Sequence, residues 1–371
     1  MANNELSVNS NKMHTITYLS LSGELSEDFK GSVLQEILLK AYRIMTLTRC
    51  FDERMIVLQR QGSISFSLSS YGEECCAVAS AAALSLQDWM YPQYREAGIM
   101  FWRGFSIQAF VDHMFGNRND GIYGRQMPNH FGAKEINVVP VSSPIGTKIP
   151  HCAGCAYAMK LQGEANIAIC YFGEGATSEG DFHAGLNFAA VRKAPAIFFC
   201  RNNGYAISTP AKEQFASDGI APKGIGYGIQ TFRVDGNDFF AVYETVQKAK
   251  KECLEGRGPV LIEAITYRLG AHSTSDDPSV YRKKDEVDRC LLNCPILRLG
   301  KYLRNQKIWN EDLEEKLLNE INLEITNAIE NAKKTLRPLL KSLFENVYFE
   351  IPQNLQQQYN EIERFYPEGD L

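Results

Sequence analysis

The strongest constraint on the fold is an alternation of short apolar runs with helical patterns, which extends from about residue 33 to residue 285. The segments 167–172 (IAICYF) and 196–200 (AIFFC) are apolar runs of strand length. Between them lies a segment of helix length with Phe182 and Leu186 on one face. Strands that alternate with helices form a parallel sheet covered by crossover helices. We therefore predict an α/β domain over residues 33–285, with helices on both faces of a parallel sheet.

Two segments that differ in composition and hydrophobic pattern flank this region. Residues 1–32 are polar and weakly patterned, which predicts an extended N-terminal arm. In residues 286–371 charge and helix period dominate, which predicts a C-terminal helical extension. Asn310 is expected to cap its main helix and Pro338 to stop it. The apolar stripe of that helix is Leu313, Leu317, Ile321, Ile325 and Ile329.

Composition excludes several classes of protein. Hydrophobic residues make up 44% and charged residues 22%, which is typical of a folded globular chain. A formal net charge of −5 and a pI near 5.8 leave no basic surface for nucleic acid. No apolar stretch approaches the roughly 18 residues that a membrane span needs. We predict neither nucleic acid nor membrane as a partner.

The cysteines and the N-terminus bear on the cellular compartment. The 10 cysteines occur in a long chain without a visible signal peptide, which favours reduced thiols over disulfides. Cys152 and Cys155 form a C-x-x-C pattern, but no second pair completes a zinc set. Their small neighbours indicate close helix packing instead. The N-terminus also lacks the arginines of a transit peptide, so we expect targeting to be absent or already removed.

Polar segments follow both predicted strands. GEG (residues 173–175) directly follows the first strand, and RNN (residues 201–203) follows the second. A parallel crossover of this length brings the carboxyl ends of both strands to the same edge of the sheet. Glu174 and Asn203 should therefore face one crevice, where open α/β sheets bind ligands.

The residue types at this edge indicate a phosphate held through a metal ion. The glycines let the backbone approach a ligand closely, and the next helix, capped by Thr177 or Ser178, would present amides that suit a phosphate. A carboxylate there would repel phosphate unless a cation lay between them, so Glu174 implies a metal. Asn203 and a nearby backbone carbonyl would complete the protein ligands of Mg²⁺. Arg201 adds a fixed positive charge for the phosphate.

The motif also resembles that of a known family. The sequence contains neither G-x-G-x-x-G nor G-x-x-x-x-G-K-[ST], the dinucleotide and nucleoside triphosphate motifs. GEG followed at this interval by NN resembles the thiamine diphosphate motif, which is usually GDG with NN. Residues 33–350 resemble the α subunits of branched-chain 2-oxoacid dehydrogenases, the thiamine-dependent decarboxylating component. These members of the family are known with Glu at the metal position.

The resemblance implies a thiamine diphosphate-binding fold and a set of site residues. Glu174, the side chain of Asn203 and the carbonyl of Tyr205 would hold Mg²⁺. The expected cofactor contacts lie in the segments QYRE, SSPIGT, GEGA, RNN and AHS: they are Tyr94, Arg95, Ser143, Ile145, Gly175, Ala176, Arg201 and His272.

The loop YRLGAHSTSDDPSVYR (residues 267–282) supplies the expected catalytic residue. By resemblance, His272 supports reductive acylation of a lipoyl group, a step that needs a side chain able to carry protons near neutral pH. Ser273 resembles the inhibitory phosphorylation site of the eukaryotic enzymes, and a phosphate there would add about −1.5 to −2 charges. Lys283 stands where the family can have a second phosphorylated Ser, so that second site is absent.

Two further segments bear on ion and substrate binding. SSPIGTK resembles the family's potassium-binding loop, in which Ser142, Pro144 and Thr147 match, but Lys148 stands where Gln is common. Either the Lys148 ammonium replaces bound K⁺ or it points to solvent. GRQMPNHFG (residues 124–132) resembles branched-chain rather than pyruvate enzymes. The expected substrate pocket consists of Phe66, Tyr94 and Met127, with His130 beside it.

The resemblance implies an enzyme that needs partners. It predicts oxidative decarboxylation of branched-chain 2-oxoacids and acyl transfer to lipoyllysine of a transacylase core. It also predicts an assembly of two α and two β chains, a regulatory kinase, and a location in the mitochondrial matrix or the bacterial cytoplasm. The alternatives are a pyruvate or acetoin dehydrogenase α subunit and a non-catalytic partner subunit.

Overall fold

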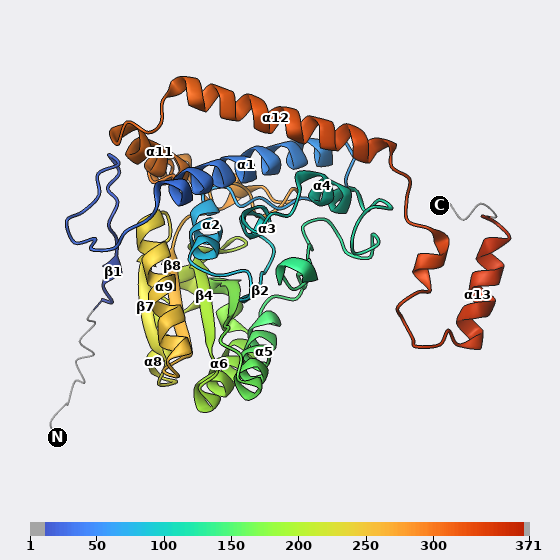
Figure 1. The fold of residues 1–371 in the computed structure, drawn as a ribbon, viewed down its shortest axis with the longest axis horizontal. Helices are drawn as coiled ribbons and strands as arrows, with labels where there is room; N and C mark the ends of the chain where they lie inside the picture. Colours follow the sequence, from blue (N-terminus) through green and yellow to red (C-terminus); the bar gives the residue numbers. More distant parts are fainter. Residues whose placement is uncertain (1–11, 367–371) are drawn as a thin grey trace.

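A six-stranded parallel sheet lies at the centre of the molecule (Figure 1). The computed structural model describes residues 12–366. The strand order is β1-β7-β8-β4-β3-β2, and every neighbouring pair is parallel, which confirms the predicted α/β class. The strands are β1 (Thr15–Ile16), β2 (Trp89–Tyr91), β3 (Ala168–Gly173), β4 (Ala196–Asn202), β7 (Gln230–Asp235) and β8 (Val260–Ile265), with a separate antiparallel pair β5 (Tyr205–Ala206) and β6 (Thr209–Pro210).

Alternating residues of the central strands enter two hydrophobic cores, one on each face of the sheet. In β3, Ile169 and Tyr171 belong to one core and Cys170 and Phe172 to the other. The first core includes helices α1 (Gln35–Arg60), α2 (Glu74–Ala82), α3 (Ala97–Trp102), α4 (Ile107–Phe115) and α9 (Phe239–Leu254), and the second includes α5 (Lys148–Gln162) and α6 (Gly180–Arg192). The short helix α8 (Ala221–Ile225) contacts β7 and β8. Both faces are therefore covered, as predicted.

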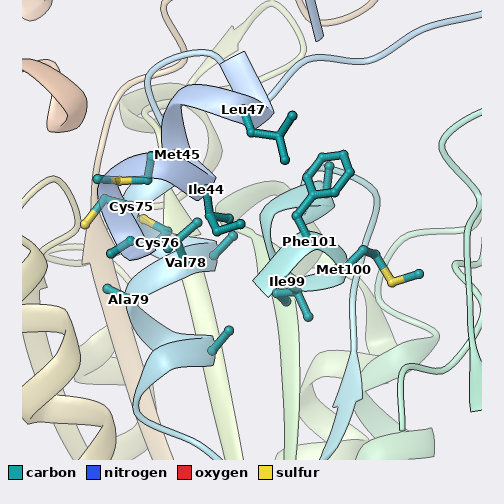
Figure 2. Packing of buried hydrophobic residues seen from close by; sticks show 14 of the residues in the cluster. Ile44, Met45, Leu47, Cys75, Cys76, Val78, Ala79, Ile99, Met100 and Phe101 are labelled. Atoms are coloured by element: carbon teal, nitrogen blue, oxygen red, sulfur yellow. The ribbon is translucent and has the colours of Figure 1, made fainter. Parts of the chain in front are cut away.

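The first core is densely packed where α1, α2 and α3 meet. Figure 2 shows Ile44 and Leu47 of α1 beside Val78 of α2 and Phe101 of α3. All nine residues of α2 except its last are buried. Such close packing holds the start of α2, and with it the preceding turn, in a fixed position relative to the sheet.

Part of the N-terminal arm joins the sheet. β1 pairs with β7, and the Asp238 side chain accepts hydrogen bonds from the amides of Tyr18 and Leu19, both at 2.6 Å. Asp238 also caps α9 by accepting from the amide of Ala241. The arm thus contributes an edge strand, and its residues 1–11 lie outside the described part of the chain.

The C-terminal residues form α10 (Lys284–Leu291), α11 (Pro295–Asn305), α12 (Glu311–Lys334) and α13 (Gln353–Glu363). Helix α12 lies alongside α1 (Figure 1). Four residues of the predicted stripe are buried, whereas Leu313, in the first turn, is 40% exposed. Asn310 caps α12 by accepting from the amide of Leu313 at 2.9 Å, as predicted. The helix ends at Lys334, a few residues before Pro338.

The remaining short elements are α7 (Ala211–Gln214) and the 3-10 helices η1 (Lys134–Ile136), η2 (Glu174–Ser178), η3 (Pro278–Val280) and η4 (Leu340–Leu343). Because η2 intervenes after β3, the prediction that Thr177 or Ser178 caps the next helix is wrong. Glu179 occupies the cap position without a side-chain bond, and the Thr177 hydroxyl donates to the carbonyl of Glu174 at 2.7 Å.

Two other predictions concern the cysteines and membrane association. The 10 cysteines, all within the described residues, are free, as predicted. Cys152 is buried in the second core, where α5 packs against α6, which agrees with a packing role for the C-x-x-C segment. No helix within residues 12–366 has the length and apolar character that crossing a membrane would require.

Candidate active site

A small cavity of about 160 Å³ lies at the carboxyl edge of the sheet, where the segments that follow β2, β3, β4 and β8 converge. Its position is the one that open parallel sheets use for ligands. Its lining is Gln93, Tyr94, Arg95, Ile145, Gly173, Glu174, Gly175, Ala176, Arg201, Asn203, Tyr205, Ala206, Ile207, Arg268 and His272. The expected metal ligands and all expected cofactor contacts except Ser143 therefore line one cavity.

Glu174 presents an unused carboxylate oxygen. Its side chain is 1% exposed, and Oε2 accepts from the amide of Asn203 at 3.2 Å. Oε1 is buried without a hydrogen-bond partner. Burial raises the pKa of Glu174 to about 7, with the nearby Glu73 charge adding to the effect. A buried carboxylate with a free oxygen is suited to a bound cation.

The turn after β4 adds two further oxygens. The Asn203 amide donates through Nδ2 to Glu73 Oε1 at 3.0 Å, and its Oδ1 accepts from the amide of Tyr205 at 3.1 Å. The carbonyl of Tyr205 accepts from Arg268 Nη1 at 3.2 Å. Carboxylate, amide and carbonyl oxygens are the ligands that Mg²⁺ prefers, so these residues fit that ion. Residues 12–366 hold no group of three or more His, Cys, Asp or Glu side chains placed to bind a metal ion together.

Gly175 is required by the packing of the turn itself. A Cβ built on it would lie 2.9 Å from the Cβ of Ala206, closer than such atoms normally approach. A Cβ on Gly173 would meet only the carbonyl of Arg201, at 4.0 Å. The two glycines of GEG thus differ, because only Gly175 is in tight contact with another part of the chain.

Arg201 is held between two carboxylates. Its Nε contacts Glu96 Oε1 and its Nη1 contacts Glu73 Oε2, both at 2.5 Å, and its side chain is 2% exposed. Burial alone would lower the pKa of Arg201, but the charges of Glu96 and Glu73 outweigh burial and raise the pKa above its ordinary value. The guanidinium therefore remains charged at the cavity wall in a fixed orientation.

Arg95 fixes the loop that carries His272. Its guanidinium donates to the carbonyls of Ser69 and His272, and Nη2 lies 3.1 Å from His272 Nδ1. A guanidinium cannot accept a hydrogen bond, so Nδ1 must be the acceptor and the proton of the neutral ring is on Nε2. Burial, and then the charges of Arg95 and Arg268, lower the pKa of His272 to about 4. His272 is therefore a neutral Nε2–H donor at physiological pH. This pKa lies below the near-neutral range expected from the sequence, because the loop buries the ring beside Arg95 and Arg268.

The expected substrate pocket is only partly assembled around the cavity. The Tyr94 ring lies edge-on to His272, with ring centroids 6.2 Å apart. His130, Ser143 and Met127 form a cluster of their own: Ser143 Oγ is 2.7 Å from His130 Nε2 and 3.8 Å from Met127 Sδ. Phe66 is half-buried and is absent from the cavity lining.

The His130 tautomer is set in the opposite way to that of His272. Its Nδ1 lies 3.1 Å from the carbonyl of Pro128, which can only accept, so Nδ1 carries the proton. Nε2 then accepts from the Ser143 hydroxyl. Burial lowers the pKa of His130. This hydrogen bond joins the loop of Ser143 to the segment that contains Met127.

The loops expected to hold the cation and the phosphorylation site contain internal hydrogen bonds. Ser142 Oγ donates to the carbonyl of Pro144 at 3.5 Å. Thr147 precedes α5 without capping it through its side chain. Lys148, the first residue of α5, is half-buried, and burial lowers its pKa. In the loop of His272, the His272 amide donates to Asp276 Oδ2 at 2.7 Å. Ser273 is only 9% exposed, and its Oγ lies 3.0 Å from Ser275 Oγ.

Sequence reasoning missed four polar or charged residues of the cavity and its wall: Gln93, Glu96, Arg268 and Glu73. Gln93 Oε1 accepts from the amide of Gly173 at 2.8 Å, and Glu96 Oε2 accepts from three successive amides of its own turn. Arg268 is 1% exposed with its Nε unpartnered. A usable signal was the pair of acids that opens the apolar helix after Gly72, because acids at buried positions require partners.

Comparison with known proteins places the chain in a family. The family model described as "Dehydrogenase E1 component" matches residues 42–341. The chain belongs to this family.

Relatives with high sequence identity to this chain carry one common name. A mouse protein is 49% identical over 331 residues, which covers 89% of this chain and 75% of the relative. A Caenorhabditis elegans protein is 50% identical over 330 residues, covering 88% and 76%. A Dictyostelium discoideum protein is 44% identical over 349 residues, covering 93% and 79%. Each is named 2-oxoisovalerate dehydrogenase subunit alpha, mitochondrial.

Proposed function

We propose that this chain is the α subunit of a branched-chain 2-oxoacid dehydrogenase, which decarboxylates branched-chain 2-oxoacids oxidatively and passes the acyl group to lipoyllysine of a transacylase. The observation that carries the proposal is the buried, unpartnered Oε1 of Glu174, which lies in a turn hydrogen-bonded to Asn203. Membership of the dehydrogenase E1 component family and the names of the relatives support the same function.

Thiamine diphosphate with Mg²⁺ is the proposed cofactor. Glu174, the Asn203 side chain and the Tyr205 carbonyl would hold the metal, and the positive charges of Arg95, Arg201 and Arg268 line the same cavity for the diphosphate. When bound, thiamine diphosphate supplies the carbanion and the electron sink that loss of CO₂ requires. The protein binds and orients the reactants around it.

His272 is the proposed catalytic residue of the acyl transfer. Because Arg95 occupies Nδ1, the Nε2–H group is available for hydrogen bonding to an oxygen or sulfur acceptor. A neutral imidazole keeps this proton and stabilises negative charge that develops on the acceptor by donating a hydrogen bond to it. The carbonyl contact with Arg95 and the bond from the His272 amide to Asp276 hold the residue in place.

Met127, Tyr94 and Phe66 are proposed to surround the branched aliphatic tail, with His130 beside them. Met127 is 41% exposed, so an apolar surface is available for a ligand. The bond from Ser143 to His130 fixes the position of this wall relative to the loop of Ser143 and Ile145. One methylene changes binding in such a pocket by only about 1–3 kcal/mol, so selectivity over straight-chain acids is expected to be partial.

Lys148 is proposed to take the place of K⁺ beside Ser142, Pro144 and Thr147. The lysine is half-buried at the start of α5, which favours a charge placed inside the loop over one pointing to solvent. The affinity for thiamine diphosphate should then change little when Na⁺ replaces K⁺. A strong requirement for K⁺ would refute this role of Lys148.

Ser273 is proposed as a target of a regulatory kinase. It lies next to His272 and is 9% exposed, so the loop must open before a kinase can reach the hydroxyl. A phosphate of about −1.5 to −2 charges would then keep the loop from closing on the cavity. Mass spectrometry of the kinase-treated assembly tests this, and an unmodified Ser273 in an inactivated enzyme would refute it.

The assembly is proposed to contain two α and two β chains on a lipoyl-bearing transacylase core. The relatives are named as mitochondrial proteins, which supports the mitochondrial matrix as the location of this chain. Among the described residues, Glu174 is the only acid that lines the cavity, and it faces the proposed metal. The carboxylates of Glu73 and Glu96 behind the wall are paired with Arg201. We therefore expect the β chain to supply the carboxylate that activates the aminopyrimidine.

The proposal is tested on this chain co-purified with its β subunit. Decarboxylation that depends on Mg²⁺ and thiamine diphosphate is followed with a dye acceptor, using 2-oxoisovalerate, 2-oxoisocaproate and pyruvate. Higher kcat/KM for the branched acids is expected. A preference for pyruvate would overturn the substrate class, and a stable, cofactor-loaded assembly without turnover would show a non-catalytic subunit.

A further inference from the structure

Glu73 contacts three polar side chains at the wall of the cavity. Its carboxylate is 1% exposed, Oε2 lies 2.5 Å from Arg201 Nη1, and Oε1 accepts from Asn203 Nδ2 at 3.0 Å. Arg95 Nε is 4.0 Å from Oε1. Glu73 therefore joins two of the cavity arginines to the side chain of Asn203, one of the three residues proposed to hold Mg²⁺.

These contacts determine which way the Asn203 amide points. A carboxylate only accepts, so the group that faces Glu73 must be the NH₂ of Asn203. The amide of Tyr205 only donates, so the group that faces it must be the oxygen of Asn203. Turning the amide over would place acceptor against acceptor at Glu73 and donor against donor at Tyr205. One orientation of the amide therefore satisfies both neighbours.

The adjacent Asn202 is held in the same way by a different acid. Its Nδ2 donates to the buried Glu263 at 2.7 Å, and its Oδ1 accepts from the amide of Gly204 at 3.2 Å. Both asparagines of the NN pair thus have their NH₂ group on a buried carboxylate and their oxygen in the turn. The geometry of the turn is set by two acids that lie far away in the sequence.

Glu73 is itself rigidly placed. It stands at the start of α2, whose residues Cys75, Cys76, Val78 and Ala79 are packed into the first core (Figure 2). Its amide donates to the carbonyl of Ser70 at 2.7 Å. This packing fixes the backbone of Glu73, and the contacts with Arg201 and Asn203 hold its carboxylate in place.

We infer that Glu73 is a positioning residue for the metal site: it holds the Asn203 amide so that the oxygen, and not the NH₂ group, is available to the divalent cation. This inference rests on the proposed function, because it takes Asn203 to be a ligand of Mg²⁺. Partners of this kind, which orient a ligand without touching the metal, typically change metal affinity by about 10–100-fold when they are mutated.

The substitution Glu73→Gln tests the inference with almost no change in shape. The oxygen of the introduced glutamine would accept from the charged Arg201, which leaves its NH₂ group facing the NH₂ group of Asn203. If Asn203 turns over to accept from that NH₂ group, its NH₂ replaces its oxygen at the metal. If it does not turn over, it loses the hydrogen bond that holds its oxygen toward the metal. We expect the dissociation constant of Mn²⁺, used as the probe for this site, to rise by about 10–100-fold.

A second substitution separates orientation from simple loss of stability. An aspartate at position 203 has an oxygen on both sides, so its orientation does not matter. In the Glu73→Gln background, Asn203→Asp should restore Mn²⁺ affinity, since the introduced glutamine donates to one oxygen while the other remains free. In the background of Glu73, the same substitution places two carboxylates in contact and should weaken binding. The effect of Asn203→Asp is therefore expected to reverse its sign between the two backgrounds.

Glu74→Gln is the matched control. Glu74 is the next residue, is equally buried, and also pairs with an arginine, Arg49, at 2.5 Å. Its other side-chain contact is the amide of Gly72 at 3.1 Å, and it does not contact Asn203. This variant should lose stability while its Mn²⁺ affinity stays within about threefold of the unmodified protein, well short of the 10–100-fold effect of losing an orienting partner.

The measurement is the free Mn²⁺ signal in electron paramagnetic resonance, titrated against the assembly with the β subunit at saturating thiamine diphosphate. If the unmodified assembly binds no Mn²⁺ in a cofactor-dependent way, the proposed function fails. If it binds Mn²⁺ but Glu73→Gln binds equally well, the inference about Glu73 is overturned. An equal gain from Asn203→Asp in both backgrounds would also overturn it, because added charge alone would then explain the effect.

Discussion

Replacing Glu174 with Gln should stabilise the metal-free protein while it abolishes metal binding. The carboxylate is 1% exposed with Oε1 unpartnered, and burial raises its pKa from 4.5 to about 7. That rise corresponds to about 3 kcal/mol, because one pKa unit is worth about 1.4 kcal/mol. The ionised group therefore opposes folding by about this amount at pH 8, and a neutral amide of the same shape removes the penalty.

The pH dependence has a definite sign. A carboxyl whose pKa is raised by folding binds protons more tightly in the folded state, so its contribution to stability is lost as the pH rises from about 4.5 to about 7. The assay is urea unfolding of the assembly with the β subunit at pH 5 and pH 8, in EDTA or in Mg²⁺ with thiamine diphosphate. In EDTA at pH 8, Glu174→Gln should unfold at higher urea than the unmodified protein.

With Mg²⁺ and thiamine diphosphate present, the unmodified protein should be more stable than Glu174→Gln. The unmodified protein gains stability by binding the cofactor, whereas the variant gains little because it has lost a charged ligand. Two results would refute the reasoning: a variant that is less stable than the unmodified protein in EDTA at pH 8, or one that is stabilised by the cofactor to the same extent.

Three further outcomes are expected. Burial raises the pKa of Asp52 to about 7, so the unmodified protein should lose stability as the pH rises from about 4 to 7, and Asp52→Asn should reduce that loss. Urea unfolding of both proteins at pH 5 and pH 8 checks this. An equal loss of stability in the two proteins would contradict it. His272→Gln should slow acylation of a lipoyl domain by about 10²–10⁴-fold. Because the pKa of His272 is about 4, the part of the rate that depends on His272 should stay constant between about pH 5.5 and 8. Stopped-flow rates of both proteins across that range decide both points. Ile325→Ala, at a fully buried position of α12, should cost about 2–5 kcal/mol in urea unfolding without changing KM, and a loss below about 1 kcal/mol would show that α12 packs loosely.

The elements that were predicted correctly share a local origin. The strands β3 and β4 correspond to continuous apolar runs in the sequence. A parallel crossover between them places Glu174 and Asn203 at one edge of the sheet, independently of the rest of the chain. The cap of α12 by Asn310 is likewise a matter of four consecutive residues. Such features depend on neighbours in the sequence, so the sequence contains the information that specifies them.

The misplaced and missed features depend on distant residues. The turn after β3 closes as a 3-10 helix and not as a capped helix start, with Gly175 in contact with Ala206 from another segment. Glu73 meets Asn203 although 130 residues separate them. No periodicity or motif reports such a pairing.

The sequence alone therefore determined the parallel α/β architecture and the edge of the sheet at which Glu174 and Asn203, the proposed ligands of Mg²⁺, come together. Only the tertiary structure decided that Arg201 is clamped by two acids, that Arg95 leaves the proton of His272 on Nε2, and that the free oxygen of Glu174 is buried. The physical reason is that charge state, tautomer and amide orientation follow from desolvation and from the one or two groups in contact. Those groups are brought together by the packing of the whole chain.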